Sequence, residues 1–161
     1  MSVLEVRNLK KYFKTPSGYL HAVDDVSFSI SAGSTLGVVG ESGCGKSTLG
    51  RVIIRLLDST DGTILFNGQD ITNVKETKAL RREMQIVFQD PFASLNPRMS
   101  VSEIIGEPLH IHNICKGAEL QKRVEELMDT VGLAQRFASS YPHELDGGRR
   151  QRIGIARALA L

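Results

Sequence analysis

The chain has 161 residues and a formal net charge of +2, with acidic and basic side chains interspersed, a balance that gives no support for general nucleic-acid binding. Its apolar stretches fall far short of the roughly 20 residues that a membrane span needs, and charged residues stand where a signal peptide would be apolar. Two cysteines do not make a disulfide framework, so we expect a soluble intracellular domain, or a large part of a longer protein.

The first part of the chain is expected to be mostly β. Residues 3–9 alternate like an edge strand, and residues 22–30 alternate like the partner of that strand. Pro16-Ser17-Gly18 lies between them and indicates the turn that joins the two strands.

A glycine-rich loop follows, between the apolar, β-branched run 34–39, which predicts a buried strand, and residues 49–57, which have helical spacing. The loop pattern G-x-x-x-x-G-K-[ST] is carried, with one following residue, by Gly40, Glu41, Ser42, Gly43, Cys44, Gly45, Lys46, Ser47 and Thr48. In a strand, loop and helix of this kind, backbone N–H groups and the helix dipole converge on one point and favour a polyphosphate. Lys46 adds a positive charge for the β- and γ-phosphates, and the Ser47 hydroxyl can coordinate Mg²⁺.

The segment after this helix predicts more β structure. Residues 63–66 read as a strand closed by an Asn67-Gly68 turn, which indicates a hairpin or meander. Residues 75–82 predict a short charged helix, and residues 84–88 predict a buried strand that ends at Gln89.

Beyond Pro91 the pattern becomes helical. Helices are expected at residues 101–109, 119–131, 133–140 and 147–161. In the second of these, Leu120, Val124, Leu127 and Met128 form one apolar stripe, which is more typical of a core than of a partner groove.

Two further segments carry a resemblance to a known family. The run from Tyr141 to Ala160, which contains Leu-Asp-Gly-Gly-Arg, resembles the signature motif and following helix of ATP-binding-cassette (ABC) ATPases. The run from Ile86 to Met99, Ile-Val-Phe-Gln-Asp-Pro-Phe-Ala-Ser-Leu-Asn-Pro-Arg-Met, resembles their glutamine loop in the form seen in dipeptide, oligopeptide and nickel importers. The resemblance extends from residue 3 to residue 161, with each motif in the family's order.

This resemblance implies roles for several residues. Phe13 falls where the family stacks an aromatic ring on adenine, with Tyr12 as the fallback, and such stacking suits any base. Gln89 matches the residue that contacts Mg²⁺ and the attacking water and that moves with the membrane subunits. Gly147 and Gly148 match the signature glycines, which reach across a dimer to the γ-phosphate of the partner's ATP.

The signature departs from the usual Leu-Ser-Gly-Gly-Gln at two places, Asp146 and Arg149. Asp is as good a helix N-cap as Ser, but a carboxylate that faces a γ-phosphate repels it unless its charge is compensated. We expect Arg149 to compensate it through an ion pair or a capping interaction.

Two elements of the family's catalytic machinery are absent from these residues. No apolar run followed by Asp-Glu occurs between Met1 and Leu161, so the catalytic Glu is missing, and no histidine follows the signature to serve as the switch His. The resemblance therefore implies the N-terminal part of a longer ATPase, and we do not expect these residues to hydrolyse ATP by themselves.

The expected fold class is α/β, a truncated P-loop NTPase of the ABC ATPase type. It would combine an N-terminal antiparallel β subdomain, a partial RecA-like core and a helical signature subdomain. The β subdomain and the P-loop part of the core are expected at residues 1–91, the helical subdomain at 92–146 and the signature helix, returning to the core, at 147–161.

The function implied by the resemblance is that of the ATP-binding subunit of an importer for peptides or nickel, with ATP and Mg²⁺ as its ligands. Such a subunit works at the cytoplasmic face of the membrane as a homo- or heterodimer on integral permease subunits, supplied indirectly by an extracytoplasmic substrate-binding protein. A non-transport ABC ATPase stays open as an alternative, although no fused cassette or coiled-coil insert is visible. A P-loop kinase or GTPase of another family is a further alternative, but it would leave the signature run unexplained. The Asn-Lys-x-Asp motif, which reads guanine, does not occur.

Overall fold

The computed structural model describes residues 2–161, which fall into two compact units. The first unit ends at Thr77 and contains the sheet, and the second begins at Lys78 and is built from helices. Within residues 2–161, no helix has both the length and the apolar character needed to cross a bilayer. The subdomain boundaries expected at residues 91 and 146 stay a prediction.

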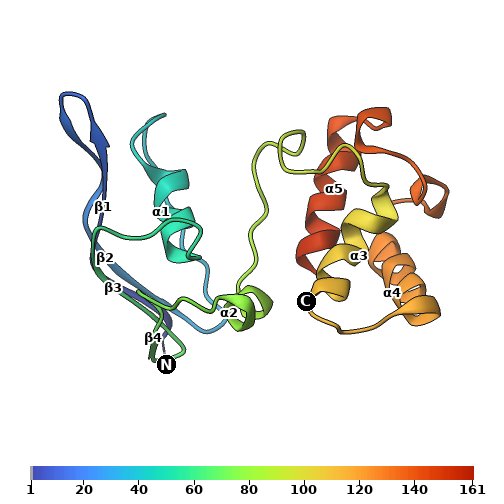
Figure 1. Ribbon diagram of the computed structural model, residues 1–161, viewed down its shortest axis with the longest axis horizontal. Helices are drawn as coiled ribbons and strands as arrows, with labels where there is room; N and C mark the ends of the chain where they lie inside the picture. The colour runs from blue at the N-terminus through green and yellow to red at the C-terminus, as the bar shows by residue number, and fades with distance from the viewer. Residues whose placement is uncertain (1) are drawn as a thin grey trace. The chain divides into compact units, whose positions relative to one another are not determined.

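The first unit is organised around an antiparallel sheet with the strand order β2-β1-β3-β4 (Figure 1). The strands are β1 (Ser2–Thr15), β2 (Gly18–Ser31), β3 (Asp61–Phe66) and β4 (Gln69–Asp70). The predicted hairpin is confirmed, because β1 pairs with β2 and the turn falls between Thr15 and Gly18. The expectation that the first strand is an edge strand is wrong, because β3 pairs with its other side.

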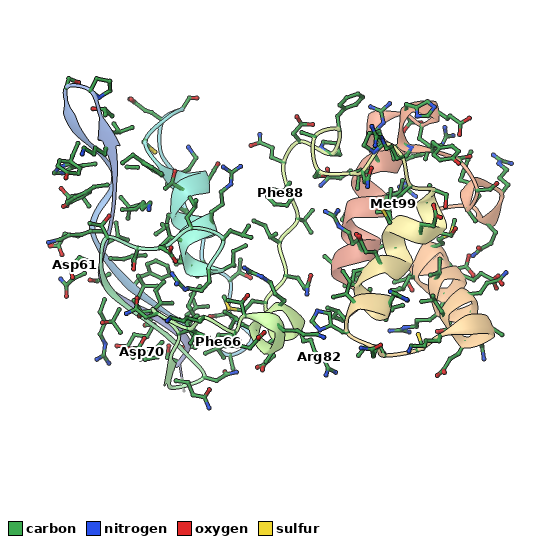
Figure 2. The ribbon with its side chains drawn as sticks, in the orientation of Figure 1. Asp61, Phe66, Asp70, Arg82, Phe88 and Met99 are labelled. Atoms are coloured by element: carbon green, nitrogen blue, oxygen red, sulfur yellow. The ribbon has the colours of Figure 1, made fainter. Side chains whose placement is uncertain are left out.

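The second predicted hairpin turn is also confirmed. Asn67 and Gly68 have φ angles of 49° and 79°, and positive φ at both central residues is what a type I′ turn requires. Figure 2 shows Asp61 and Phe66 near the two ends of β3 and Asp70 on β4 beyond the turn.

Helix α1 (Lys46–Ile53) packs its apolar face, with Leu49, Val52 and Ile53 buried, against β1 and β2. It ends earlier than the predicted residue 57 because Arg55 adopts a left-handed φ of 59°. The amides of Arg55 and Leu56 donate to the carbonyls of Val52 and Arg51, which is the hydrogen-bond pattern of a Schellman stop.

The strands predicted at residues 34–39 and 84–88 are not formed, and these expectations are wrong for this structure. A strand needs neighbours for its backbone N–H and C=O groups, and within residues 2–161 no strand pairs with either segment. The side chains remain accessible as a result, with Val39 exposed to 92%. Both segments therefore have the apolar, β-branched composition of buried strands, but neither belongs to a sheet among the described residues.

The second unit packs three longer helices around one core. Its helices are α2 (Lys78–Glu83), α3 (Val101–Ile111), α4 (Gly117–Thr130) and α5 (Gly147–Ala158), with 3-10 turns η1 (Gln135–Phe137) and η2 (Pro142–Glu144). Helix α3 packs against both α4 and α5 (Figure 1). Of the predicted stripe on α4, Val124, Leu127 and Met128 lie in this core, and Leu120 is partly buried against it.

The helix predicted at residues 133–140 is wrong, because only η1 forms there. The carbonyls of Ala138 and Ser140 accept hydrogen bonds from Ser102 and Val101 at 2.9 Å each. These carbonyls cap the first turn of α3, whose amides have no partner within their own helix. Residues 133–140 therefore cap helix α3 and do not form an α-helix of their own.

Acid should weaken the start of α3. The Glu103 carboxylate accepts hydrogen bonds from the Ser100 amide at 2.7 Å and from the Ser100 hydroxyl at 2.8 Å, forming a capping box. These two hydrogen bonds, the backbone one first, hold the pKa of Glu103 below its ordinary value of 4.5. The stabilisation is therefore complete above that ordinary value and is lost as the pH falls through the lower pKa of the folded state.

We accordingly expect Glu103→Gln to lower the thermal midpoint at pH 7 and to match the wild type only in acid, once the pH has fallen below the lowered pKa of Glu103 in the folded state. The matched control is Glu107→Gln on the same helix, outside the capping box, which should follow the wild type at every pH. Melting curves of the three proteins across this range provide the check. A gap between Glu103→Gln and wild type that stays constant with pH would contradict the assignment.

Candidate functional site

The predicted phosphate loop is an irregular segment that runs directly into α1. The Lys46 ammonium donates hydrogen bonds to the Gly40 and Glu41 carbonyls, at 2.9 Å each. Its positive charge is thereby held over the loop, beside the first turn of α1, where the helix dipole is also positive. The two sources of positive potential act on the same place, as an anion site requires.

Gly45 fixes the geometry at the point where the loop becomes a helix. It has a φ of 80°, and a Cβ atom added to it would lie 1.8 Å from the Ala22 carbonyl oxygen on β2. No side chain fits there, because the backbone of β2 occupies the space. The glycine therefore lets the beginning of α1 approach the sheet and gives the loop its tight return.

The other predicted loop residues line the same segment. Glu41, Ser42, Gly43, Cys44 and Ser47 are exposed, and Gly45, Lys46 and Thr48 are half-buried. The Cys44 sulfur lies 3.9 Å from the Lys46 ammonium, and the thiol is free. All nine predicted residues, 40–48, are thus contiguous around the start of α1, with the Ser47 hydroxyl accessible.

The two candidate aromatics differ in their surroundings. The Tyr12 ring stacks on His21, with the ring centres 3.8 Å apart, and its hydroxyl donates to Asp24. That hydrogen bond, followed by burial, raises the pKa of Tyr12 to about 12, because ionisation would place two negative charges together. The Phe13 ring has the Lys11 ammonium 5.0 Å from its centre. Tyr12 is thus already engaged within the sheet, which leaves Phe13 as the better candidate for a base.

Gln89 is exposed, and it follows a segment without regular secondary structure, residues 84–88, and precedes an ordered loop in the second unit. Figure 2 places Phe88 in the segment without regular structure that leads to this loop and Met99 just ahead of α3. Asp90 begins the loop by accepting from the amides of Phe92 and Ala93 at 2.8 and 3.2 Å. The Asp90 hydrogen bonds therefore fix the chain directly after Gln89.

The signature residues form the N-terminus of α5, as the resemblance implies. Asp146 is the N-cap, and its carboxylate accepts from the Arg149 amide at 2.8 Å. The same carboxylate makes an ion pair with the Arg149 guanidinium at 2.9 Å, so the predicted compensation is confirmed. The Arg149 amide first, and then the Arg149 charge, lower the pKa of Asp146. Gly147 and Gly148 occupy the first turn of the helix beside this pair.

Sequence reasoning missed an aromatic platform beside the signature. The Phe137 ring lies 4.6 Å from the Arg149 guanidinium and 5.0 Å from that of Arg136. With Arg152 and Gly148 these residues line a hollow of about 400 Å³. No local sequence pattern indicates this contact, because Phe137 lies in η1, twelve positions before Arg149. The platform fixes the direction of the Arg149 side chain, since guanidinium groups stack well on aromatic faces.

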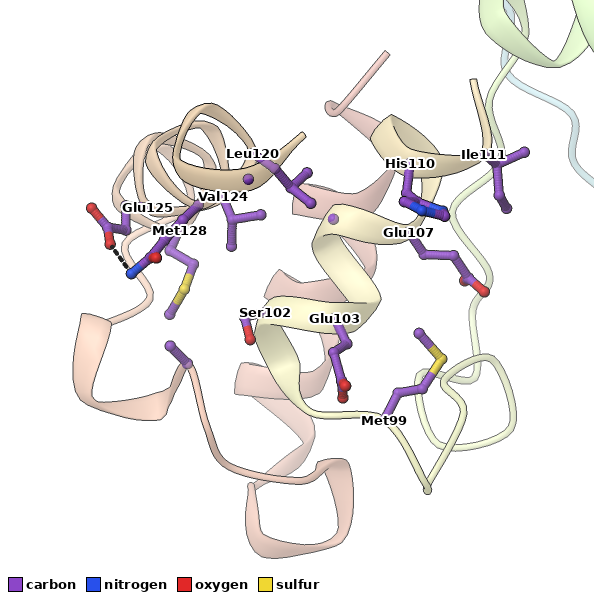
Figure 3. Close-up of a pocket in the computed structure, with 14 residues that line it drawn as sticks. Met99, Ser102, Glu103, Glu107, His110, Ile111, Leu120, Val124, Glu125 and Met128 are labelled. Carbon is purple, nitrogen blue, oxygen red and sulfur yellow. Dashed lines mark hydrogen bonds between the residues drawn. The ribbon is translucent and has the colours of Figure 1, made fainter. Parts of the chain in front are cut away.

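A larger groove lies between α3 and α4, with a volume of about 610 Å³ (Figure 3). Leu120 and Val124 from α4 form its apolar floor, together with Gly106 of α3, where an added Cβ would lie 3.3 Å from Val124. Its rim carries carboxylates: Figure 3 shows Glu103 and Glu107 projecting from α3 and Glu125 hydrogen-bonded on α4. An apolar floor with an acidic rim suits an amphipathic segment with basic residues on its flank.

Comparisons with known proteins agree with this geometry. The family model described as "ABC transporter" matches residues 23–161. The chain is 58% identical to "Oligopeptide transport ATP-binding protein OppF" of Bacillus subtilis (strain 168), a match that covers 99% of this chain and 53% of that protein. It is 51% identical to "Glutathione import ATP-binding protein GsiA" of Escherichia coli (strain K12), over 99% of this chain and 27% of that protein. The chain thus spans about half the length of the first of these relatives.

Solved structures show the same fold. The ATP-binding cassette MJ0796, in a dimeric post-hydrolysis state bound to ADP and Pi, superposes with a TM-score of 0.90 at 31% identity, covering 98% of this chain and 69% of that one. The cassette cbiO1 from Clostridium perfringens gives a TM-score of 0.76 at 28% identity, covering 99% and 61%. Because the family model matches most of its length, the chain belongs to the ABC transporter ATP-binding family.

Proposed function

We propose that this chain is the nucleotide-binding half of the ATPase subunit of a peptide importer. The observation that carries the proposal is that one chain holds both a lysine-centred phosphate loop at the start of α1 and a capped, glycine-opened helix at α5. The first binds a nucleotide within its own subunit, and the second serves the nucleotide of a partner subunit in a dimer. MJ0796, the structural neighbour, is a dimer in its ADP-bound form, which supports this arrangement.

In this proposal ATP binds with its phosphates in the loop 40–48. Lys46 exchanges its bonds to the Gly40 and Glu41 carbonyls for bonds to the β- and γ-phosphates, which are stronger acceptors because they are charged. The accessible Ser47 hydroxyl would coordinate Mg²⁺, an ion that prefers oxygen ligands and substrate phosphates. Phe13 would stack on the adenine, with Tyr12 as the fallback.

Hydrolysis would need groups beyond these residues. A bound Mg²⁺ would neutralise charge on the phosphates, and the residues of this chain would position the nucleotide. Neither a catalytic Glu after an apolar strand nor a switch His occurs in residues 1–161. We therefore assign binding, dimer contact and coupling to these residues, and hydrolysis to the full-length subunit.

The peptide cargo is inferred from the relatives. OppF is named for oligopeptide transport and GsiA for import of glutathione, itself a short peptide, and both align with nearly the whole chain. These names favour peptides over the nickel cargo that the glutamine loop also allows. The subunit would act at the cytoplasmic face of the membrane, attached to permease subunits and supplied through them by a binding protein.

The groove between α3 and α4 is the surface that we assign to the permease. Its occupant would be a short amphipathic helix from the cytoplasmic side of a permease subunit. The apolar side of that helix would cover Leu120 and Val124, and basic residues on its flank would meet Glu107 and Glu125.

This assignment predicts that Glu107→Lys weakens attachment to the permease severalfold and slows association, because a repulsive charge then replaces an attractive one at the rim. ATP affinity should not change. The matched control is Glu119→Lys on α4, which lies outside the groove. Co-purification of the subunit with its permease, compared for the two variants, measures the effect. If both variants co-purify with the permease to the same extent, the groove is not the surface that binds the permease.

Transport assays test the proposed function directly. Cells that lack the gene should lose most of their uptake of a labelled oligopeptide. The wild-type gene should restore uptake, and the Lys46→Ala gene should not. If the cells lose nickel uptake in place of peptide uptake, the proposed cargo is wrong. If the uptake of both is unchanged, the proposal that this protein belongs to an importer is rejected.

A further inference from the structure

The loop that follows Gln89 is anchored in the second unit. Asp90 accepts from two amides of the loop, and the Ser94 hydroxyl bonds to the Pro91 carbonyl at 3.3 Å. Leu95 is buried to 4% exposure and belongs to the core formed with α3, α4 and α5. The residue after Gln89 is thus already part of a folded loop, which constrains where Gln89 can go.

Two arginines of α5 reach this loop. Arg150 and Arg157 are seven residues apart, so they share one face of the helix and are separated by about 10 Å along its axis. The Arg157 guanidinium donates to the Ser94 carbonyl at 2.9 Å, in a partly buried position. The Arg150 guanidinium lies 4.7 Å from the centre of the Phe92 ring, and its Nε donates to the Pro142 carbonyl at 2.7 Å.

A third arginine fastens the same helix to α4. Arg152 donates to the carbonyls of Val131 and Gly132, at 3.1 and 2.7 Å, at the C-terminus of α4. A cation at that position also interacts favourably with the helix dipole. Helix α5 is therefore tied to the loop after Gln89 and to one wall of the groove, and it is the helix whose first turn contains Gly147 and Gly148.

We propose that Arg150 and Arg157 are positioning residues that clamp the loop after Gln89 to the signature helix. The clamp consists of the Arg157 bond to Ser94 and the Arg150 contact with Phe92. Through it, a displacement of Gln89 is transmitted to the signature glycines, and the reverse also holds. The inference rests on the proposed function, because Gln89 and the glycines are taken to serve the nucleotide sites.

The contacts themselves favour coupling over simple stabilisation. Phe92 is exposed to 66%, so its ring contributes little buried area to the fold. An exposed ring is a poor source of stability, yet Phe92, like Ser94, lies within five residues of Gln89. Removing the two contacts should therefore change the communication between the two motifs more than it changes the melting temperature.

The test compares paired variants in the full-length subunit. Arg157→Ala and Phe92→Leu break the clamp, whereas Arg157→Lys keeps a donor for Ser94 and Phe92→Tyr keeps an aromatic ring for Arg150. We expect the first pair to lower kcat by about two- to thirtyfold, the range found for substitutions in coupling networks, with KM for ATP and the thermal midpoint close to wild type. The second pair should recover at least about half of the lost rate.

Two controls make the outcome decisive. Arg123→Ala on α4, which removes an exposed ion pair to Glu126, should leave kcat unchanged. Lys46→Ala tests the nucleotide site itself: if hydrolysis survives it, the proposed function fails. If Lys46→Ala abolishes hydrolysis but Arg157→Ala and Phe92→Leu keep the wild-type kcat, the clamp is rejected and the nucleotide site stands. A fall in kcat that follows the thermal midpoint and is not rescued by Lys or Tyr also overturns the clamp.

Discussion

Replacement of Lys46 by alanine is expected to weaken ATP binding by about ten- to a hundredfold, because hydrogen bonds to charged groups contribute about 1.5–3 kcal/mol. The ammonium donates to the Gly40 and Glu41 carbonyls and so stands over the loop where the phosphates would lie. Alanine removes both the charge and this arrangement. Fluorescent nucleotide titration of the full-length protein measures the change in affinity.

The matched control for Lys46→Ala is Lys122→Ala, which removes an exposed charge from α4 and should leave ATP affinity within about twofold of wild type. Circular dichroism of each variant establishes that the helices persist. If Lys46→Ala binds ATP as tightly as the control does, the phosphate loop is wrongly assigned.

Replacement of Arg149 by glutamine is expected to reduce ATP hydrolysis, because the Asp146 carboxylate then loses its ion pair. The Arg149→Gln change leaves the backbone amide in place, so Asp146 continues to cap α5 while its charge is uncompensated. Adding Asp146→Ser should restore much of the rate, since the double change recreates the neutral pair that is usual in the family. Residues in contact typically couple by about 0.5–3 kcal/mol.

A double-mutant cycle in ATPase rate measures this coupling. The variant Phe137→Leu separates the ion pair from the aromatic platform, because it removes the ring and keeps both charges. ATP affinity of the monomer should stay nearly constant, since in the proposed function the signature would meet the nucleotide only in the dimer. Strict additivity of the Arg149 and Asp146 changes would show that the ion pair has no part in turnover.

The sequence predicted those elements whose signals are local. The Asn67-Gly68 turn needs only two residues that tolerate positive φ, and both have it. The start of α5 follows from a capping carboxylate at Asp146, and the charge pairing with Arg149 follows from their spacing of three residues. The phosphate loop is local in the same sense, because its pattern specifies one turn and one helix start.

The other features of the structure depend on contacts between distant parts of the chain, which local sequence patterns do not indicate. Residues 34–39 and 84–88 have the composition of buried strands, but strands form only where neighbours accept their hydrogen bonds. Residues 133–140 have helical spacing, yet their carbonyls cap α3. The bond from Arg157 to Ser94 spans 63 positions, and nothing in the spacing of arginines along α5 indicates it.

The central claim, that residues 40–48 bind the phosphates of a nucleotide, is tested most directly by comparing the affinities of ATP, GTP and AMP for the full-length protein with Mg²⁺ present. ATP and GTP should bind within a few-fold of each other, since stacking on an aromatic ring reads no base edges. AMP should bind at least about tenfold more weakly, because it lacks the two phosphates that Lys46 is proposed to bind. An AMP affinity equal to that of ATP would contradict the account.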